Sequence, residues 1–470
     1  MEETLNKLSS VIWGIPTLFL ILGTGIYLTI FSGFFQITYL PKAIKQFFKK
    51  LRPNQKVTDG VSPWQALCTA LAATVGTGNI AGVAGAITIG GPGAIFWMWV
   101  CAFFGMILKC AEATLAIVFR TKNEAGEILG GPMYLMERGL GTKWRPLGLT
   151  YAFFGVVAAF GVGNATQINA VIGGLHGCAE AFSITFPPYI DYLVAGALAL
   201  LIGLMLSGGA KRIGKIAEML VPFASLVYIL LGLGVLTVRY TAIPDAFSQI
   251  LRGAFSPSAV TGGAVGSLFL VCKTGAARGV FTNEAGMGTA SIAHAAASVC
   301  HPGEQGLMGI MEVFLDTIVI CTVTALVILC SGIRIPYGVD SGATLTVTAF
   351  SEIYGGWVGI VITLCMILFA LATVLGWGLY GLRCAQYLLG DKAFRWFVLV
   401  QMATVILTAV LKTGVVWLLA EIVNGLMAIP NLIALIGLSP QFFMYIHEFK
   451  FGRYSSVGGT YENFNQCKSL

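Results

Sequence analysis

Long apolar stretches recur along the whole chain and are separated by short polar segments. A helix of about 20 residues crosses the hydrocarbon core of a bilayer, and eleven stretches approach or exceed that length. They cover residues 11–31, 65–89, 94–119, 148–175, 190–206, 216–238, 261–290, 306–331, 355–382, 396–411 and 415–438. With 57% hydrophobic and 10% charged residues, the composition excludes a soluble chain. The sequence predicts an all-α polytopic membrane protein with about 11 transmembrane helices.

The basic residues indicate how the chain is oriented. Twenty Lys and Arg residues fall in loops on one side of the predicted spans, and five fall on the other side. Because cytoplasmic loops carry the excess of Lys and Arg, we expect a plasma-membrane (inner-membrane) protein with its amino terminus outside and its carboxyl terminus in the cytoplasm. The net charge of +7 then favours the anionic lipid surface, and no nucleic-acid partner is expected.

The second stretch contains a predicted break at Gly76-Thr77-Gly78-Asn79. Each glycine weakens a helix by about 1 kcal/mol relative to alanine, and in hydrocarbon an interrupted helix is tolerated only where protein or a water-filled cavity satisfies its backbone. Broken helices of this kind form the binding sites of secondary transporters. Close helix packing through Gly78, Gly82 and Ala86 is the alternative, but the accompanying Thr and Asn favour a cavity.

A second interruption, within residues 268–288, lies five spans later. Because five is odd, the two broken spans cross the membrane in opposite directions, as the halves of an inverted repeat do. We therefore divide the chain into an extra amino-terminal helix with a basic loop (1–62), two five-helix repeats (63–260 and 261–438) and a cytoplasmic tail (439–470). In the loop before the ninth span, residues 341–351 predict a short surface or re-entrant helix that could act as a lid.

Two uncharged polar side chains inside the spans are candidate ligands. The amide of Gln167 both donates and accepts hydrogen bonds, which suits an α-amino or α-carboxylate group, although an interhelical hydrogen bond explains it equally well. The hydroxyl oxygen of Thr373 suits sodium when it is combined with carbonyls of unwound backbone. Alternatively, Thr373 bonds a carbonyl of its own helix.

Four ionisable residues also lie inside the predicted spans. Lys109 and Glu112 are three residues apart, and Glu312 and Asp316 are four apart, so each pair shares one face of a helix. Intramembrane ionisable groups are functional candidates by default. We interpret Lys109 and Glu112 as a structural pair, whereas Glu312 and Asp316 either have a basic partner such as Arg278 or carry protons.

Three motifs together resemble those of one family. Residues 73–83, residues 130–134 (Gly-Gly-Pro-Met-Tyr) and residues 279–288 are similar to the alanine/glycine:cation symporter family, also called sodium:alanine symporters, within the amino acid–polyamine–organocation superfamily. The resemblance runs from about Pro63 to the end of the eleventh span. It implies a LeuT-type fold, in which ten core helices form a 5+5 inverted repeat after one extra amino-terminal helix.

The resemblance also implies which residues form the site. Its substrate contacts correspond to Thr74, Gly78 and Gln167 and, on the seventh span, to Leu270, Val271, Cys272 and Lys273. Its sodium site corresponds to Ala370 and Thr373 together with the backbone of Ala72 and Val75. Lys273 departs from the expected pattern, because a cation at the pocket disturbs sodium binding unless its side chain points away.

We therefore expect a sodium-coupled symporter that imports small neutral amino acids, alanine and glycine, by alternating access. A proton-coupled amino acid transporter is the main alternative, and a channel is a weaker one because the two breaks are pseudo-symmetric. An enzyme is not expected, since neither H-E-x-x-H nor G-x-S-x-G with plausible partners occurs, and no P-loop indicates an ATP-driven pump. The expected partners are the amino acid, sodium as coupling ion and the lipid bilayer, without a cofactor.

Overall fold

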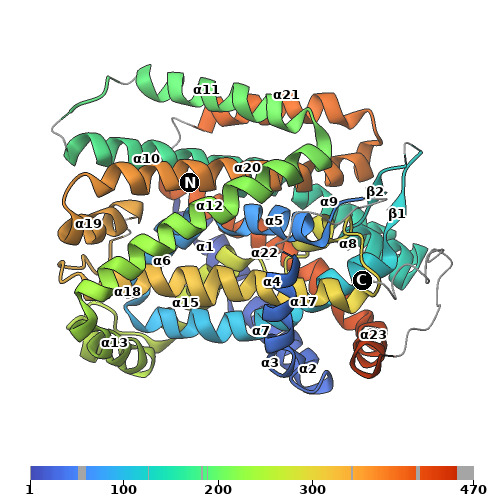
Figure 1. The fold of residues 1–470 in the computed structure, drawn as a ribbon, viewed down its shortest axis with the longest axis horizontal. Coiled ribbons are helices and arrows are strands. Elements are labelled where there is room, and N and C mark those ends of the chain that lie inside the picture. The colour runs from blue at the N-terminus through green and yellow to red at the C-terminus, as the bar shows by residue number, and fades with distance from the viewer. Residues whose placement is uncertain are drawn as a thin grey trace.

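The structure is a computed structural model that describes residues 2–50, 60–124, 126–181, 184–187, 189–339, 342–408 and 413–452. Within these ranges every element is helical except a hairpin of two short antiparallel strands, β1 (Thr121–Lys122) and β2 (Ile128–Leu129). Figure 1 shows long helices running side by side along one direction, with the hairpin at one end of the molecule.

The helices follow one another closely along the chain. Those before the hairpin are α1 (Glu2–Ile12), α2 (Ile15–Phe31), α3 (Phe35–Thr38), α4 (Leu40–Lys50), α5 (Pro63–Thr74), η1 (Thr77–Asn79), α6 (Ala81–Gly90) and α7 (Gly93–Phe119). After it come α8 (Pro132–Tyr134), η2 (Leu135–Leu140), η3 (Thr142–Trp144), α9 (Arg145–Phe160), η4 (Gly161–Ala165), α10 (Thr166–Ala181), α11 (Tyr189–Leu206), α12 (Gly209–Val238), η5 (Tyr240–Ala242), α13 (Ile243–Phe255) and α14 (Pro257–Thr261). The remaining helices are α15 (Leu268–Asn283), α16 (Thr289–His294), α17 (Pro302–Val313), η6 (Phe314–Cys321), α18 (Thr322–Cys330), α19 (Gly342–Tyr354), α20 (Val358–Leu389), α21 (Ala393–Thr408), α22 (Thr413–Gly437) and α23 (Ser439–Phe451).

Helices occupy all eleven stretches predicted from the apolar pattern. In the described part of the chain, six helices are long and apolar enough to cross a membrane, or up to eight if each of two bent pairs counts as one span. The helices in the other predicted stretches are shorter: α15 has 16 residues and ends at a break, and α21 also has 16 residues. The lid helix predicted at 341–351 corresponds to α19, although residue 341 lies outside the described residues.

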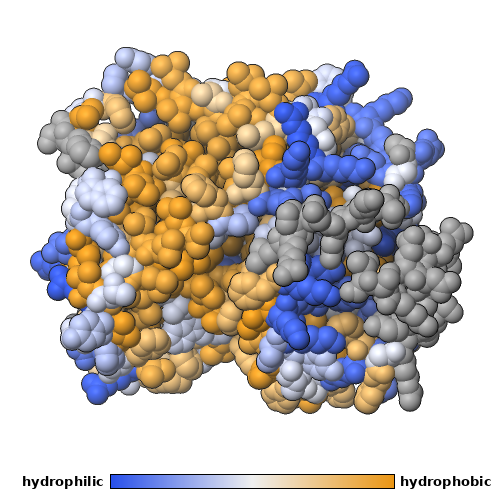
Figure 2. Space-filling model, viewed as in Figure 1, coloured by the Kyte–Doolittle hydropathy of each residue, from blue (hydrophilic) through white to orange (hydrophobic). Residues whose placement is uncertain are grey.

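The core forms where the broken helices pack against long unbroken ones. α7 packs on α15 and α17, while α20 packs on α5, α9, α10 and α12. α11 and α21 pair along one margin of the molecule (Figure 1). Figure 2 shows a broad apolar area over the middle of the molecule, with hydrophilic side chains gathered towards the end that carries the hairpin and α23. An apolar exterior of this kind suits contact with lipid.

Candidate functional site

The second span breaks at the position that the sequence predicts from its two glycines, Gly76 and Gly78. α5 ends at Thr74, α6 begins at Ala81, and the two segments are bent by 58° around the 3-10 turn η1. The side chain of Asn79 stabilises the break, because its Oδ1 accepts the N–H of Gly76 at 2.9 Å. The Ala72 carbonyl, four residues before Gly76, is thereby left without its usual helical donor.

Gln167 and Thr373 both lie against this break. Gln167 Oε1 accepts hydrogen bonds from the N–H and the hydroxyl of Thr77, at 3.3 and 2.9 Å. A Cβ atom at Gly76 would stand 2.5 Å from Thr373 Oγ1 and 3.3 Å from Gln167 Oε1, so only glycine permits this approach. The structure therefore brings α5, α10 and α20 together at one point.

The Thr373 hydroxyl is buried and has no hydrogen-bond partner among the described residues. It does not bond a carbonyl of its own helix, which was the alternative interpretation. Ala370 lies one turn earlier on α20 and is also buried, and Ala72 and Val75 occupy the end of α5, against which α20 packs. An unpartnered hydroxyl beside the open carbonyls of a helix end is a set of oxygen atoms that suits sodium.

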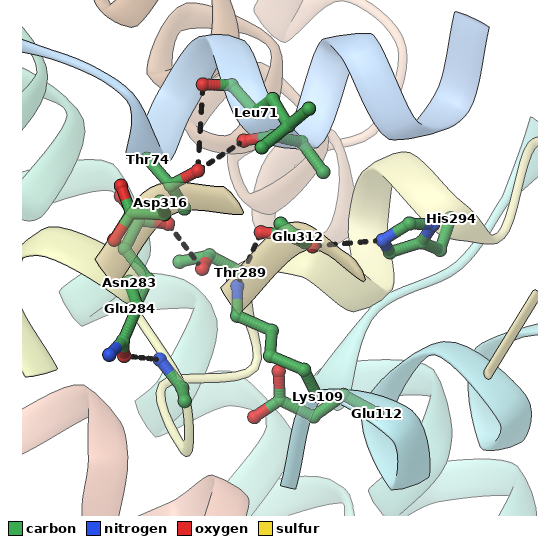
Figure 3. Close-up of polar contacts among 12 residues, drawn as sticks. Leu71, Thr74, Lys109, Glu112, Asn283, Glu284, Thr289, His294, Glu312 and Asp316 are labelled. Carbon is green, nitrogen blue, oxygen red and sulfur yellow. Dashed lines mark hydrogen bonds and ion pairs between the residues drawn. The ribbon is translucent and has the colours of Figure 1, made fainter. Parts of the chain in front are cut away.

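Two further predicted substrate contacts, Gly78 and Thr74, lie at the first break. Gly78 faces the end of α15, since a Cβ atom there would contact Thr282 and Phe281 at 3.4 and 3.5 Å. Thr74 lies in the last turn of α5, where its hydroxyl donates to the carbonyls of Ala70 and Leu71 at 3.3 and 3.5 Å (Figure 3).

The structure does not bring residues 270–273 to the first break. Leu270, Val271, Cys272 and Lys273 lie near the start of α15, and Lys273 precedes the last residue of α15, Asn283, by ten residues, or about 15 Å along the axis. Val271 is buried, whereas Leu270 is 37% exposed. The residues of this span that meet the first break are Phe281 and Thr282.

The seventh span breaks after Asn283. Glu284 adopts a left-handed conformation (φ +54°), as do Gly286 and Gly288, before α16 begins at Thr289. Glu112 on α7 holds this break in place: its Oε1 accepts the N–H groups of Gly286 and Gly288 at 3.0 and 3.1 Å. Asn431 on α22 donates to the same oxygen at 2.9 Å.

The buried charges pair differently from the sequence-based interpretation. Lys109 Nζ lies 2.8 Å from Glu312 Oε1, and His294 Nε2 lies 3.0 Å from Glu312 Oε2; Figure 3 shows Glu312 between these two partners. Lys109 is therefore the basic partner of Glu312, and Glu112 bonds the backbone of the second break instead of forming a pair with Lys109. Spacing within one helix cannot reveal such partners, because they come from other helices.

Asp316 connects the two breaks. Its Oδ1 accepts from Asn79 Nδ2 at 2.6 Å, and its Oδ2 accepts from the Thr317 hydroxyl at 2.7 Å. The same hydroxyl accepts from Asn283 Nδ2 at 3.1 Å. Asp316 lies in the π-helical turn η6, four residues after Glu312, and has different partners from Glu312. π-helical turns are frequent at functional sites, and a second such turn, η4, ends two residues before Gln167.

A family model described as the sodium:alanine symporter family matches residues 1–458. The chain belongs to this family. A sodium/alanine symporter, AgcS of Methanococcus maripaludis, is 45% identical over 92% of this chain and 94% of its own length. An uncharacterised transporter of Haemophilus influenzae is 44% identical over 93% of this chain and 94% of its own length. The chain is thus a membrane transporter and not an enzyme.

A solved structure supports the fold of this symporter family member. The crystal structure of MhsT in complex with L-phenylalanine aligns with a TM-score of 0.54 at 13% identity, covering 84% of this chain and 99% of MhsT. The symporter is therefore a multi-pass helical membrane protein that shares the general LeuT-type architecture.

Sequence reasoning missed several residues of the symporter's second break. Tyr151 on α9 donates to the Met287 carbonyl at 3.0 Å, and Asn431 also donates to the Gly286 carbonyl at 2.9 Å. A signal existed for Asn431, which follows Pro430 within an apolar helix. For Tyr151 the sequence offers no comparable signal, since a tyrosine in an apolar helix is unremarkable in itself.

Proposed function

We propose that the symporter imports alanine and glycine together with sodium, by alternating access around the two broken helices. The observation that carries this proposal is the buried, unpartnered Thr373 hydroxyl beside the first break, at the point that Gln167 also contacts. A binding site at the junction of broken helices is typical of secondary transporters.

The proposed sodium ligands are the Thr373 hydroxyl and the carbonyls of Ala72, Val75 and Ala370. Their support is the packing of α20 on the end of α5 and the diversion of the Gly76 N–H to Asn79. Sodium prefers hard oxygen ligands, and these residues offer only such atoms. Sodium acts here as the coupling ion.

The proposed substrate site lies beside Gly78 and Gln167, at the turn where Thr74 ends α5. We place the contribution of the seventh span at Phe281 and Thr282 in preference to Leu270, Val271, Cys272 and Lys273, because the former face Gly78. The first N–H groups of α6 offer an anion site for the substrate carboxylate. The aromatic ring of Phe281 lies against Gly78 and would restrict the proposed site to a small side chain.

The finer topology is part of the same proposal. We propose two inverted five-helix repeats (63–260 and 261–438) after one extra helix, with the amino terminus outside the plasma membrane and the carboxyl terminus in the cytoplasm. The support is the excess of basic residues on one side of the spans and the hydrophilic end of the molecule that carries the hairpin and α23 (Figure 2).

Uptake by the purified protein in liposomes tests this function. We expect labelled alanine to accumulate when sodium is high outside, to be competed by glycine, and to fall to the level of empty liposomes without a sodium gradient. Accumulation driven by a proton gradient in the complete absence of sodium would instead support the proton-coupled alternative. Competition by leucine as strong as that by glycine would contradict the small pocket.

A further inference from the structure

The second break contains more buried carboxyl groups than the described residues provide cations to pair with them. Glu112, Glu284 and Glu312 are all fully or almost fully buried. The fixed cation among them, Lys109, is paired with Glu312, and His294 bonds the other oxygen of the same carboxylate. Burying an unpaired charge is costly, so Glu112 and Glu284 require another source of compensation.

The two remaining carboxyl groups differ in their surroundings. Glu112 Oε1 accepts three hydrogen bonds, from Gly286, Gly288 and Asn431. Glu284 has one such bond in the described structure, between its Oε2 and the Thr289 hydroxyl at 2.6 Å. Three donors compensate an anion well, whereas one does not. The protein therefore provides fewer hydrogen-bond donors to ionised Glu284 than to ionised Glu112.

Polar atoms without partners surround the same place. Among the described residues, the Tyr380 hydroxyl, the Trp377 indole N–H, Glu112 Oε2 and Asn431 Oδ1 are buried and have no hydrogen-bond partner. The Trp377 indole lies close enough to the Glu284 carboxylate to stabilise its ionised form, and Tyr380 interacts electrostatically with Glu284. Such a set of atoms indicates a site for water or an ion.

The backbone conformation at Glu284 also indicates a functional role for this residue. Glu284 is one of two non-glycine residues with a positive φ in the described chain, at +54°. A glycine would adopt this conformation without strain, so the carboxyl side chain is retained at a cost. Strain of this kind is concentrated at functional sites.

We propose that Glu284 is a proton-binding residue, and that its protonation changes during the transport cycle. The Glu284 carboxylate takes a proton from a hydronium ion, which becomes water, and releases it by the reverse reaction. When Glu284 is ionised, the Trp377 N–H and the Tyr380 O–H are the donors available to it. Trp377 lies four residues after Thr373 on α20, so the same helix joins this site to the proposed sodium site.

Several other titratable groups lie in the same buried cluster as Glu284. Lys109 on α7, Glu312 on α17, Tyr151 on α9 and Tyr380 on α20 interact with it directly. Glu112 on α7, Asp316 in η6 and His294 on α16 belong to the same buried cluster through their interactions with Glu312. Lys109 and His294 are bonded to Glu312, Asp316 is bonded by Asn79 and Thr317, and Tyr151 donates to Met287. Glu112 is the competing candidate for the proton, and the experiment separates the two.

The experiment compares the wild type with Glu284→Gln, Glu112→Gln and a control, Glu352→Gln, whose side chain is exposed on α19. Sodium-driven uptake of labelled alanine is measured in liposomes from about pH 5 to about pH 9 without a pH gradient. We expect the wild-type and Glu352→Gln rates to vary about threefold or more across this range. Glu284→Gln mimics the protonated residue, so its rate should match the acid plateau of the wild type at every pH.

A second measurement detects the proton directly. Sodium and alanine are added to the purified wild type in weakly buffered detergent solution, and a pH-sensitive dye reports protons bound or released. We expect a proton to be exchanged in the wild type and none in Glu284→Gln. Absence of exchange in a wild-type sample that binds alanine, an unaltered pH profile in Glu284→Gln, or flattening by Glu112→Gln alone would overturn the proposal. Because the inference rests on the proposed transport function, uptake at a single fixed pH reports separately whether that function fails.

Discussion

At the scale of single residues, Thr373 offers the clearest test of the sodium site. Thr373→Val keeps nearly the same volume and removes only the hydroxyl, which has no protein partner in the described structure. We expect normal folding, because no hydrogen bond is lost, and a higher sodium concentration for half-maximal uptake. The measurement is alanine uptake against sodium concentration in liposomes. A curve that coincides with the wild type would remove Thr373 from the site.

Gln167 is the second residue whose role can be isolated. Gln167→Ala leaves the N–H and the hydroxyl of Thr77 without their acceptor, which costs about 1–3 kcal/mol of stability and disorders the first break. We expect uptake to be abolished while the folded yield falls only modestly.

A matched control for Gln167 exists in another buried glutamine. Gln401 on α21 donates to Asn164 Oδ1 at 2.8 Å and does not contact the break. Gln401→Ala removes a buried amide of the same size, so it should lower stability to a similar extent and leave the alanine concentration for half-maximal uptake unchanged. Equal losses of uptake in the two variants would assign Gln167 a structural role only.

At the scale of elements, the sequence predicts the two broken helices to different extents. The first break was predictable because two glycines, a threonine and an asparagine interrupt an apolar run at one point. The sequence also predicts an interruption in the seventh span, but the residues of this span that contact the first break are Phe281 and Thr282, about three turns after 270–273. A motif marks the neighbourhood of a break, whereas the residue at which the helix ends depends on partners such as Glu112 and Asn431 from other helices.

The close approach at the first break leads to a prediction about that element. Gly76→Ala would place its methyl group 2.5 Å from Thr373 Oγ1 and 3.3 Å from Gln167 Oε1, which forces α5 and α20 apart. We expect loss of alanine uptake and of sodium dependence together. Gly82→Ala on α6 is the control, because its methyl group would meet only Thr282 Cγ2, at 4.0 Å. Uptake is measured beside the thermal unfolding midpoint, and a fully active Gly76→Ala protein would show that the two helices need not approach so closely.

At the scale of the whole molecule, the two breaks form one connected unit. Asp316 bonds Asn79 at the first break and, through Thr317, Asn283 at the second. Glu112, Asn431 and Tyr151 fix the second break to three further helices. A movement of either broken helix is therefore transmitted to the other, which is what alternating access around a central site requires.

The orientation of the molecule in the membrane yields the last prediction. The hairpin, α4 and α23 belong to the hydrophilic end, where Lys450 Nζ donates to the Ser32 carbonyl at 2.6 Å, whereas α19 lies at the opposite end (Figure 1). If the basic loops are cytoplasmic, a cysteine at Glu352 on α19 should react with a membrane-impermeant maleimide in intact cells. A cysteine at Glu124 in the hairpin should react only after permeabilisation. Both side chains are exposed, and the variants are made in a transport-competent background without native cysteines. The reverse labelling pattern would invert the proposed topology, and labelling of both sites in intact cells would contradict the odd number of spans proposed between them.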